Sequence, residues 1–146
     1  MDIRVKVKKL RSDAVVPSYE TAGSAGCDLR ACLAEAVSIA PGETVMIPTG
    51  LSMEIPPAYV GLVFARSGLS TKHGLAPANK VGVIDSDYRG EWTVGLLNHS
   101  AETRTVEPGE RIAQAVFVPC VTAVFTETET LSDTARGEGG FGSTGR

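Results

Sequence analysis

The sequence predicts an all-β fold, a sandwich or a barrel built from many short strands. Three observations favour this class. Short apolar runs follow one another along the chain, Pro-Gly and Pro-Pro pairs mark turns between them, and no stretch of ten or more residues shows a helical period. With 146 residues, the chain is most simply one domain, large enough to bury a core.

The expected strands begin near the N-terminus. Ile3, Val5 and Val7 alternate with basic residues, which is the pattern of a half-buried strand. Further strands are predicted over residues 44–55, 59–64, 81–84, 92–97, 111–118 and 121–125, and one short helical turn over residues 67–73. Apolar content falls and glycine content rises after about Leu131. This change predicts a core over residues 1–131 and a flexible arm over residues 132–146.

Composition excludes several functional classes. The net charge of −3 argues against broad nucleic-acid binding, which needs a basic surface. No apolar run approaches eighteen residues, and the N-terminus does not resemble a secretion signal, so we expect no membrane span. Cys27, Cys32 and Cys120 lack C-x-x-C spacing and predict free thiols in the cytoplasm. His73 and His99 stand alone, which argues against an all-protein zinc site.

The first stretch with chemical potential is SAGCDLRA, residues 24–31. On its own, this pattern is most simply a turn that enters a strand. The functional alternative is that Asp28 is a carboxylate held near a metal-bound water.

The second stretch, ARSGLSTKHG over residues 65–74, follows an apolar strand. It presents an arginine fork at Arg66, a hydroxyl at Ser67 and the backbone amide of Gly68 at the start of a helical turn, a combination that suits a phosphate. The alternative is a capped short helix with Ser67 as the N-cap residue. Both can hold, because an N-cap is also an anion site, and we favour the phosphate.

The third stretch, NKVGVIDSDYRGEW over residues 79–92, is predicted to form a β-hairpin from its turn chemistry. Asp85 and Asp87 lie beside Tyr88. A solvated Asp-rich turn is the alternative to a functional site. Because Asp85 directly follows Ile84, we expect it to be partly buried, where it would be a stronger base and could act as a general base. The sequence alone does not choose between the two aspartates.

The fourth stretch is PGERIAQAVF, residues 108–117. Arg111 and Gln114 interrupt an apolar strand. An unpaired buried amide costs about 1–3 kcal/mol, so Gln114 either bonds a neighbouring backbone group or points into a site.

The fifth stretch, RGEGGFGSTGR, ends the chain at residues 136–146. A phosphate loop needs Gly-Lys-Ser/Thr followed by a helix, and neither is present. Composition favours a disordered tail. Phe141 and Arg136 instead suggest an arm that becomes ordered on binding, with glycines that let the backbone approach a ligand closely.

Taken together, these stretches closely resemble the five motifs of the trimeric deoxyuridine triphosphatases, the dUTPases. The resembling segments are AGCDL, RSGLSTKHG, GVIDSDYRGE, GERIAQ and RGEGGFGSTG, and the resemblance extends from about Pro17 to the end of the chain. Two small departures occur. Ala65 stands where the family often has proline, and Ala115 stands where a larger aliphatic residue is usual. Neither departure removes a functional group.

The resemblance implies a jelly-roll-like, distorted β-barrel of the β-clip type, and a homotrimer whose three active sites lie between subunits. It also implies Mg²⁺-dependent hydrolysis of dUTP to dUMP and pyrophosphate, which keeps uracil out of DNA and supplies dUMP for thymidylate synthesis. Two alternatives share this scaffold: dCTP deaminase and a non-catalytic nucleotide-sensing module. The intact residue 82–91 segment and the arm with its phenylalanine favour the dUTPase.

Roles for individual residues also follow from the resemblance. Asp85 would activate the water that attacks the α-phosphorus, Tyr88 would pack against the sugar and exclude a 2′-hydroxyl, and Asp28 would contact Mg²⁺ through water. The other substrate-binding residues would be Arg66, Ser67, Gly68 and Gln114 for the phosphates, Asn79, Val83 and Ile84 for uracil, and Arg136, Phe141, Gly142, Ser143 and Thr144 in the closing arm.

Overall fold

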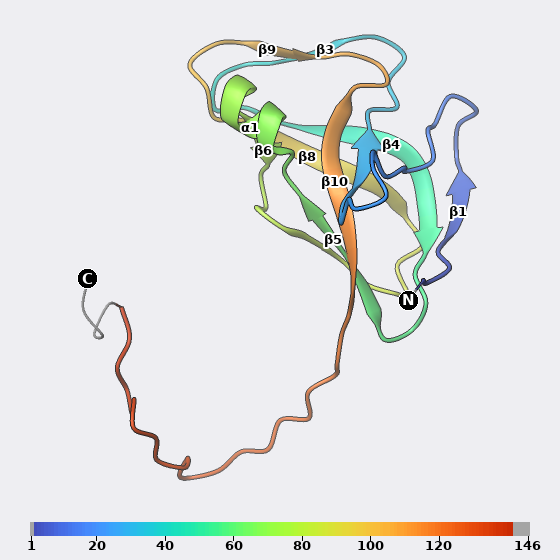
Figure 1. Ribbon diagram of the computed structural model, residues 1–146. Coiled ribbons are helices and arrows are strands. Elements are labelled where there is room, and N and C mark those ends of the chain that lie inside the picture. Colours follow the sequence, from blue (N-terminus) through green and yellow to red (C-terminus); the bar gives the residue numbers. More distant parts are fainter. Residues whose placement is uncertain (1, 142–146) are drawn as a thin grey trace.

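The computed structural model describes residues 2–141 and is an all-β protein with one short helix (Figure 1). Its elements are β1 (Lys6–Lys9), β2 (Cys27–Arg30), β3 (Val37–Ile39), β4 (Thr44–Glu54), β5 (Tyr59–Phe64), α1 (Ser67–His73), β6 (Leu75–Pro77), β7 (Gly82–Ile84), β8 (Glu91–Asn98), β9 (Arg104–Val106) and β10 (Arg111–Pro119). The predicted fold class and the helical turn over residues 67–73 are confirmed.

The strands form two four-stranded antiparallel sheets and one small one. The first large sheet has the order β1-β4-β8-β6, the second has the order β2-β10-β5-β7, and β3 pairs with β9. In Figure 1 the β3–β9 pair lies across one end of the molecule, beside α1. The core lies between the two large sheets, because each sheet turns one apolar face inward.

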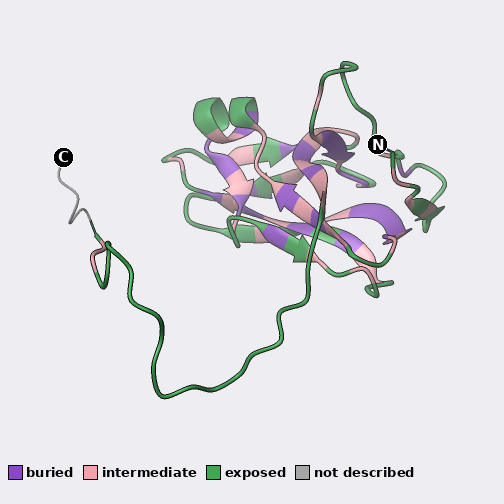
Figure 2. Cartoon of the chain, turned by 60° about the horizontal axis from the view of Figure 1, so that its bottom comes forward, coloured by how far each residue is buried: buried purple, intermediate pink, exposed green. Residues whose placement is uncertain are grey.

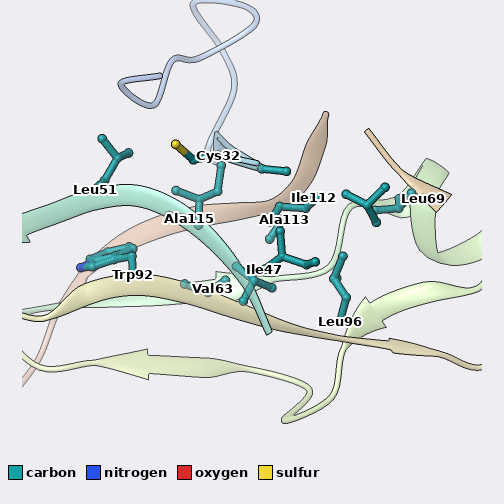
Figure 3. Packing of buried hydrophobic residues seen from close by; sticks show 14 of the residues in the cluster. Cys32, Ile47, Leu51, Val63, Leu69, Trp92, Leu96, Ile112, Ala113 and Ala115 are labelled. Atoms are coloured by element: carbon teal, nitrogen blue, oxygen red, sulfur yellow. The ribbon is translucent and has the colours of Figure 1, made fainter. Parts of the chain in front are cut away.

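Alternation along β8 shows how the sequence directs this packing. Trp92, Val94 and Leu96 are buried, and the residues between them are less buried or exposed, as the two-residue period of a strand requires. Figure 3 shows Trp92 and Leu96 among other buried side chains of the core. The next inward residue, Asn98, is polar, and its amide donates to the carbonyls of Ile39 and Glu102. These bonds satisfy a fully buried side chain.

The predicted hairpin is wrong. Strand β7 pairs with β5, whereas β8 pairs with β4 and β6, so residues 85–90 cross from one large sheet to the other. Turn residues predict that the chain reverses direction, but they do not determine which strand the following segment pairs with.

The predicted strand over residues 121–125 is also wrong. Strand β10 ends at Pro119, and residues 120–141 contain no helix or strand. Phe125 is 93% exposed, and Val121 and Val124 are equally open to solvent. This segment leaves the body of the protein (Figure 2), so no strand of the same chain lies beside it to pair with.

The N-terminal strand is shifted from the predicted residues 3–7 to Lys6–Lys9, where it pairs with the end of β4. The short strands β3, β6 and β9 were not predicted. Between residues 2 and 141, no helix is long and apolar enough to cross a membrane.

Candidate active site

Two groups of predicted site residues lie at opposite ends of β5. Arg66 follows the C-terminal end of β5 and leads into α1. Strand β7 runs antiparallel to β5 with Ile84 opposite Gly61, which places Asp85 beside Val60 near the start of β5. Six residues at about 3.3 Å each separate the backbones of these two positions by roughly 20 Å. The predicted site residues of one chain therefore fall into two separate groups, which we call half-sites.

The first half-site is a polar cavity of about 380 Å³. Strand pairing brings its parts together, because Gln114 of β10 lies opposite Asp28 of β2 on one side and Phe64 of β5 on the other. We call this the phosphate cradle; its residues are Asp28, Arg66, Ser67, Gly68 and Gln114, and its walls are completed by Glu20, Ser24, Ala25 and Gly26. Five predicted residues from three separate stretches thus meet in one place.

Asp28 organises the arginines of the cradle. Its carboxylate is almost completely buried, with Oδ1 accepting from Nε of Arg66 at 2.8 Å and Oδ2 accepting from Nη1 of Arg111 at 3.2 Å. Arg111 also donates to Glu20 at 2.8 Å. The hydrogen bond to Asp28 raises the pKa of Arg111, so this guanidinium remains charged. The resulting row of alternating charges fixes Arg66 at the wall of the cavity.

Glu20 and Arg111 were not predicted as site residues. Arg111 had been noticed only as a charge within an apolar strand. The sequence carried no signal for the contact of Arg111 with Asp28, because it depends on the pairing of β10 with the strand that contains Asp28.

The sequence left two possibilities for Gln114, a bond to the backbone or a place in a site, and the structure shows a backbone bond and a place in the cavity wall. Its Nε2 donates to the backbone carbonyl of Ala65 at 2.9 Å, and its side chain also lines the cradle. Gly26 makes this arrangement possible. A Cβ atom at residue 26 would overlap Oε1 of Gln114 and lie 3.1 Å from its Cδ.

The interpretation of Ser67 as an N-cap is wrong. The N-cap residue of α1 is Arg66, with φ −89° and ψ 130°, and no side chain caps the helix. Ser67 is the first helical residue, and it lines the cradle together with Gly68. The first turn of α1 therefore brings a hydroxyl and uncapped backbone amides to the cavity wall.

The second half-site is a loop of residues 85–90, which we call the crossing loop. Tyr88 N–H donates to Asp85 O at 3.2 Å, and the guanidinium of Arg89 donates to the carbonyls of Ser86 and Tyr88 at 2.7 and 3.1 Å. These bonds make the loop a compact turn. Its Asp85 is exposed, so the expected partial burial of this carboxylate is wrong for the single chain.

A cavity of about 210 Å³ lies against the crossing loop, lined by Val83, Ile84, Asp85, Tyr88, Glu91, Trp92 and Thr93. Four of the predicted site residues share it, and Asp87 is not among its walls. Tyr88 is 44% exposed, and its hydroxyl donates to Glu91 O at 3.0 Å. Ligand pockets usually measure about 300–1,000 Å³, so this cavity is smaller than a typical one.

The remaining predicted residues lie elsewhere. Asn79 is exposed and precedes β7, at the end of that strand remote from Asp85. Arg136 and Phe141 belong to residues 120–141, which follow β10 without helix or strand. This segment extends away from the body of the protein (Figure 1). Arg136 donates from Nε to Gly139 O at 2.7 Å, and the Phe141 ring is fully exposed. Gly142, Ser143 and Thr144 lie outside the described residues.

The described residues fit a metal ion carried by phosphates better than a protein-built metal site. Within residues 2–141, no cluster of three or more His, Cys, Asp or Glu side chains is arranged to hold a cation. Both oxygens of Asp28 already accept from arginines, although each retains a lone pair for a water molecule. Mg²⁺ usually keeps several waters and binds through one or two carboxylates and substrate phosphates, which matches this donor set.

The fold and the cradle define a class: a β-clip, jelly-roll-like protein with a polar cavity at one end of its sheet. Comparisons with known proteins identify the family within this class. A sequence model described as dUTPase matches residues 12–145. The deoxyuridine 5′-triphosphate nucleotidohydrolase of Neisseria meningitidis serogroup B is 55% identical over 148 residues, covering 99% of each chain. The enzyme of the same name from Shigella flexneri serotype 5b is 47% identical over 147 residues, covering 100% of this chain and 97% of the relative.

Solved structures agree with the sequence relatives. A mutant of the Staphylococcus bacteriophage 80alpha dUTPase, solved with dUpNHpp, has a TM-score of 0.90 and 31% identity, covering 98% of this chain and 99% of its own. A mutant dUTPase from phage phi11 of S. aureus, described for its coordination of a structural Mg(II) ion, has a TM-score of 0.81 and 26% identity, covering 90% of this chain and 100% of its own. The chain belongs to the dUTPase family. It is a hydrolase that acts on dUTP, a dUTP diphosphatase.

Proposed function

We propose that this enzyme converts dUTP to dUMP and pyrophosphate by attack of water on the α-phosphorus, with Asp85 as the general base. The position of Asp85 supports this role. Its exposed carboxylate lines the same cavity as Tyr88 and Ile84, so it can reach both a water and a nucleoside there. By the same reaction the enzyme would keep uracil out of DNA and supply dUMP for thymidylate synthesis.

In this proposal, the cradle binds the phosphates of the substrate. A triphosphate carries about four negative charges near neutral pH, while this chain has a net charge of −3, so the charge must be neutralised locally. Arg66, Ser67, Gly68 and Gln114 supply a guanidinium, a hydroxyl and amide donors around one cavity. Mg²⁺ bound to the phosphate oxygens would neutralise further charge as it develops, and Asp28 would contact its water shell. Positioning and electrostatics of this kind are the main requirements of phosphoryl transfer.

The sugar and base bind at the crossing loop. The ring of Tyr88 forms a wall of the cavity and would leave no room for a 2′-hydroxyl. Val83 and Ile84 would present backbone groups from β7 to the uracil edge, and Asn79 would be a further partner from the other end of that strand. Rejection of UTP, dCTP and dTTP would follow from the fit of the pocket and from unpaired polar groups.

Complete active sites arise between copies of the chain in a homotrimer. The observation that supports this proposal is the separation of roughly 20 Å between Asp85 and Arg66 along β5, a strand held on both sides by β10 and β7. Exposed Val121, Val124 and Phe125 provide apolar surface of the kind that binds another protein chain. The arm over residues 132–146, with Arg136 and Phe141, would close a site formed in this way. The free thiols support a cytoplasmic location.

Substrate choice is tested by measuring pyrophosphate release from each nucleotide in turn. We expect release from dUTP and none from dTTP, dCTP or UTP. Ammonia release from dCTP would contradict the proposal that dUTP hydrolysis is the sole activity.

Site sharing is tested by mixing two inactive variants. Copies with Asp85→Asn and copies with Arg66→Ala should each be inactive alone. Coexpression gives mixed trimers in which some sites combine an intact Asp85 with an intact Arg66 from another copy. Random mixing predicts about a quarter of the wild-type rate. The control mixes Asp85→Asn with Asp85→Ala and should recover nothing. If the first mixture is as inactive as the control, both residues come from one chain and the proposal is wrong.

A further inference from the structure

The crossing loop rests on an irregular part of β4. In the β4–β8 pairing, Pro48 lies opposite Thr93 and Ser52 lies opposite Glu91. Residues 49–51 therefore face Trp92 alone, which is a β-bulge. A bulge re-aims side chains, and here it turns hydroxyl groups of β4 toward the backbone of residues 89–92.

Ser52 makes the bond that reaches the loop. The residue is 8% exposed, and its Oγ donates to the carbonyl of Arg89 at 2.6 Å. A short O–H···O bond at a partly buried position holds its two groups firmly, and its loss frees the carbonyl of Arg89 from β4. Arg89 itself donates to Ser86 O and Tyr88 O, so the residue held by Ser52 also holds the rest of the loop.

Tyr88 depends on this support because the core does not hold it. Its ring is nearly half exposed and packs over Gly90, where a Cβ atom would overlap the ring. Its hydroxyl is fixed to the carbonyl of Glu91. The backbone from residue 88 to residue 91 therefore determines where the ring lies, and Ser52 binds the middle of that backbone.

We infer that Ser52 is a positioning residue that acts through the carbonyl of Arg89 on Tyr88 and so controls discrimination between dUTP and UTP. This inference rests on the proposed role of Tyr88 against the sugar. Without the hydroxyl, the crossing loop can relax away from β4. The ring then moves from the cavity wall and makes room for a 2′-hydroxyl.

The test compares kcat/KM for dUTP and for UTP in Ser52→Ala, Ser52→Thr and Thr49→Val. Thr49 is a matched control, since its buried Oγ1 donates at the same 2.6 Å to the carbonyl of Trp92, beyond the loop. We expect Ser52→Ala to lower the dUTP-to-UTP ratio about tenfold. Ser52→Thr keeps the hydroxyl and should keep the ratio. Thr49→Val should lower Tm about as much as Ser52→Ala does, with the ratio unchanged.

Two outcomes would overturn the inference. The first is an unchanged dUTP-to-UTP ratio of kcat/KM in Ser52→Ala. The second is an equal fall of this ratio in Thr49→Val, because the effect would then come from a general loss of stability. Tyr88→Ala separates the inference about Ser52 from the proposed role of Tyr88 on which it rests. If Tyr88→Ala lowers the ratio and Ser52→Ala does not, only the role of Ser52 is refuted. If Tyr88→Ala also leaves the ratio unchanged, the sugar role of Tyr88 fails and the inference fails with it.

Discussion

Replacing Gly26 with alanine should disable the phosphate cradle while leaving the fold intact. The added Cβ would overlap Oε1 of Gln114 and lie 3.1 Å from Cδ and 3.4 Å from Cβ of the same side chain. Gln114 must therefore turn away and lose its 2.9 Å bond to Ala65 O. Loss of such a partly buried bond costs about 1–3 kcal/mol. If that amide also holds phosphate in the transition state, kcat/KM should fall by about five- to 150-fold, because about 1.4 kcal/mol corresponds to a factor of ten.

Gly23→Ala is the matched control for this experiment. Gly23 lies in the same loop, and a Cβ atom there would meet nothing within 4 Å. Steady-state pyrophosphate release from dUTP measures the effect on activity, and thermal unfolding measures the effect on stability. We expect Gly23→Ala to match the wild type in both. If Gly26→Ala has the same kcat/KM as Gly23→Ala, the contact with Gln114 does not control phosphate binding and the reasoning is refuted.

Four further outcomes can be measured. Asp85→Asn should bind nucleotide normally but lose at least about a hundredfold in kcat, whereas near-normal turnover would place the base elsewhere. Truncation after Leu131 should leave a folded trimer with little activity; unfolding or dissociation in a melting or sedimentation experiment would show that the arm holds subunits together. Binding of dUMP should change the fluorescence of Trp92, the single tryptophan, because it lines the cavity beside the crossing loop, and an unchanged spectrum at saturation would place the nucleoside elsewhere. Burial raises the pKa of the Cys27 and Cys32 thiols, which keeps them protonated, so no more than one of the three thiols should react quickly with a disulfide reagent at pH 7 in the native protein.

Strands with a long alternating pattern were predictable from the sequence, and strands defined only by their partners were not. Residues 44–55, 59–64 and 111–118 were predicted nearly as β4, β5 and β10 because each carries its own apolar periodicity. The three-residue strands β3, β6 and β9 carry too little pattern to be recognised. Residues 121–125 have the apolar content of a strand, but a strand also needs a neighbour, and the described part of the chain offers none.

The candidate site also has a part that was predictable from the sequence and a part that was not. Residue types favoured a phosphate site at Arg66 and left two possibilities open for Gln114, whereas Asp28 was assigned only through the resemblance to the dUTPases. The ion pairs that connect Asp28 to Arg66 and Arg111 were not predictable, since they depend on the register of β2 against β10. The exposure of Asp85 was also missed. Its apolar neighbour Ile84 suggested burial, but β7 ends at that residue and the crossing loop begins there.

The arrangement of β5 explains why a dUTPase of this design would depend on assembly more than on loop closure. Strand β5 is bonded to β10 along one edge and to β7 along the other, so its two ends cannot approach each other without breaking both ladders. A mobile loop can cover a few ångströms, but the half-sites are separated by the length of a strand. Asp85 is exposed at one end of β5, and at the other end Arg66 lies at the wall of the cradle, where its side chain is 24% exposed. Exposure of Asp85 in the single chain contradicted its expected burial, and it is consistent with the proposal that a neighbouring subunit completes the site around this residue.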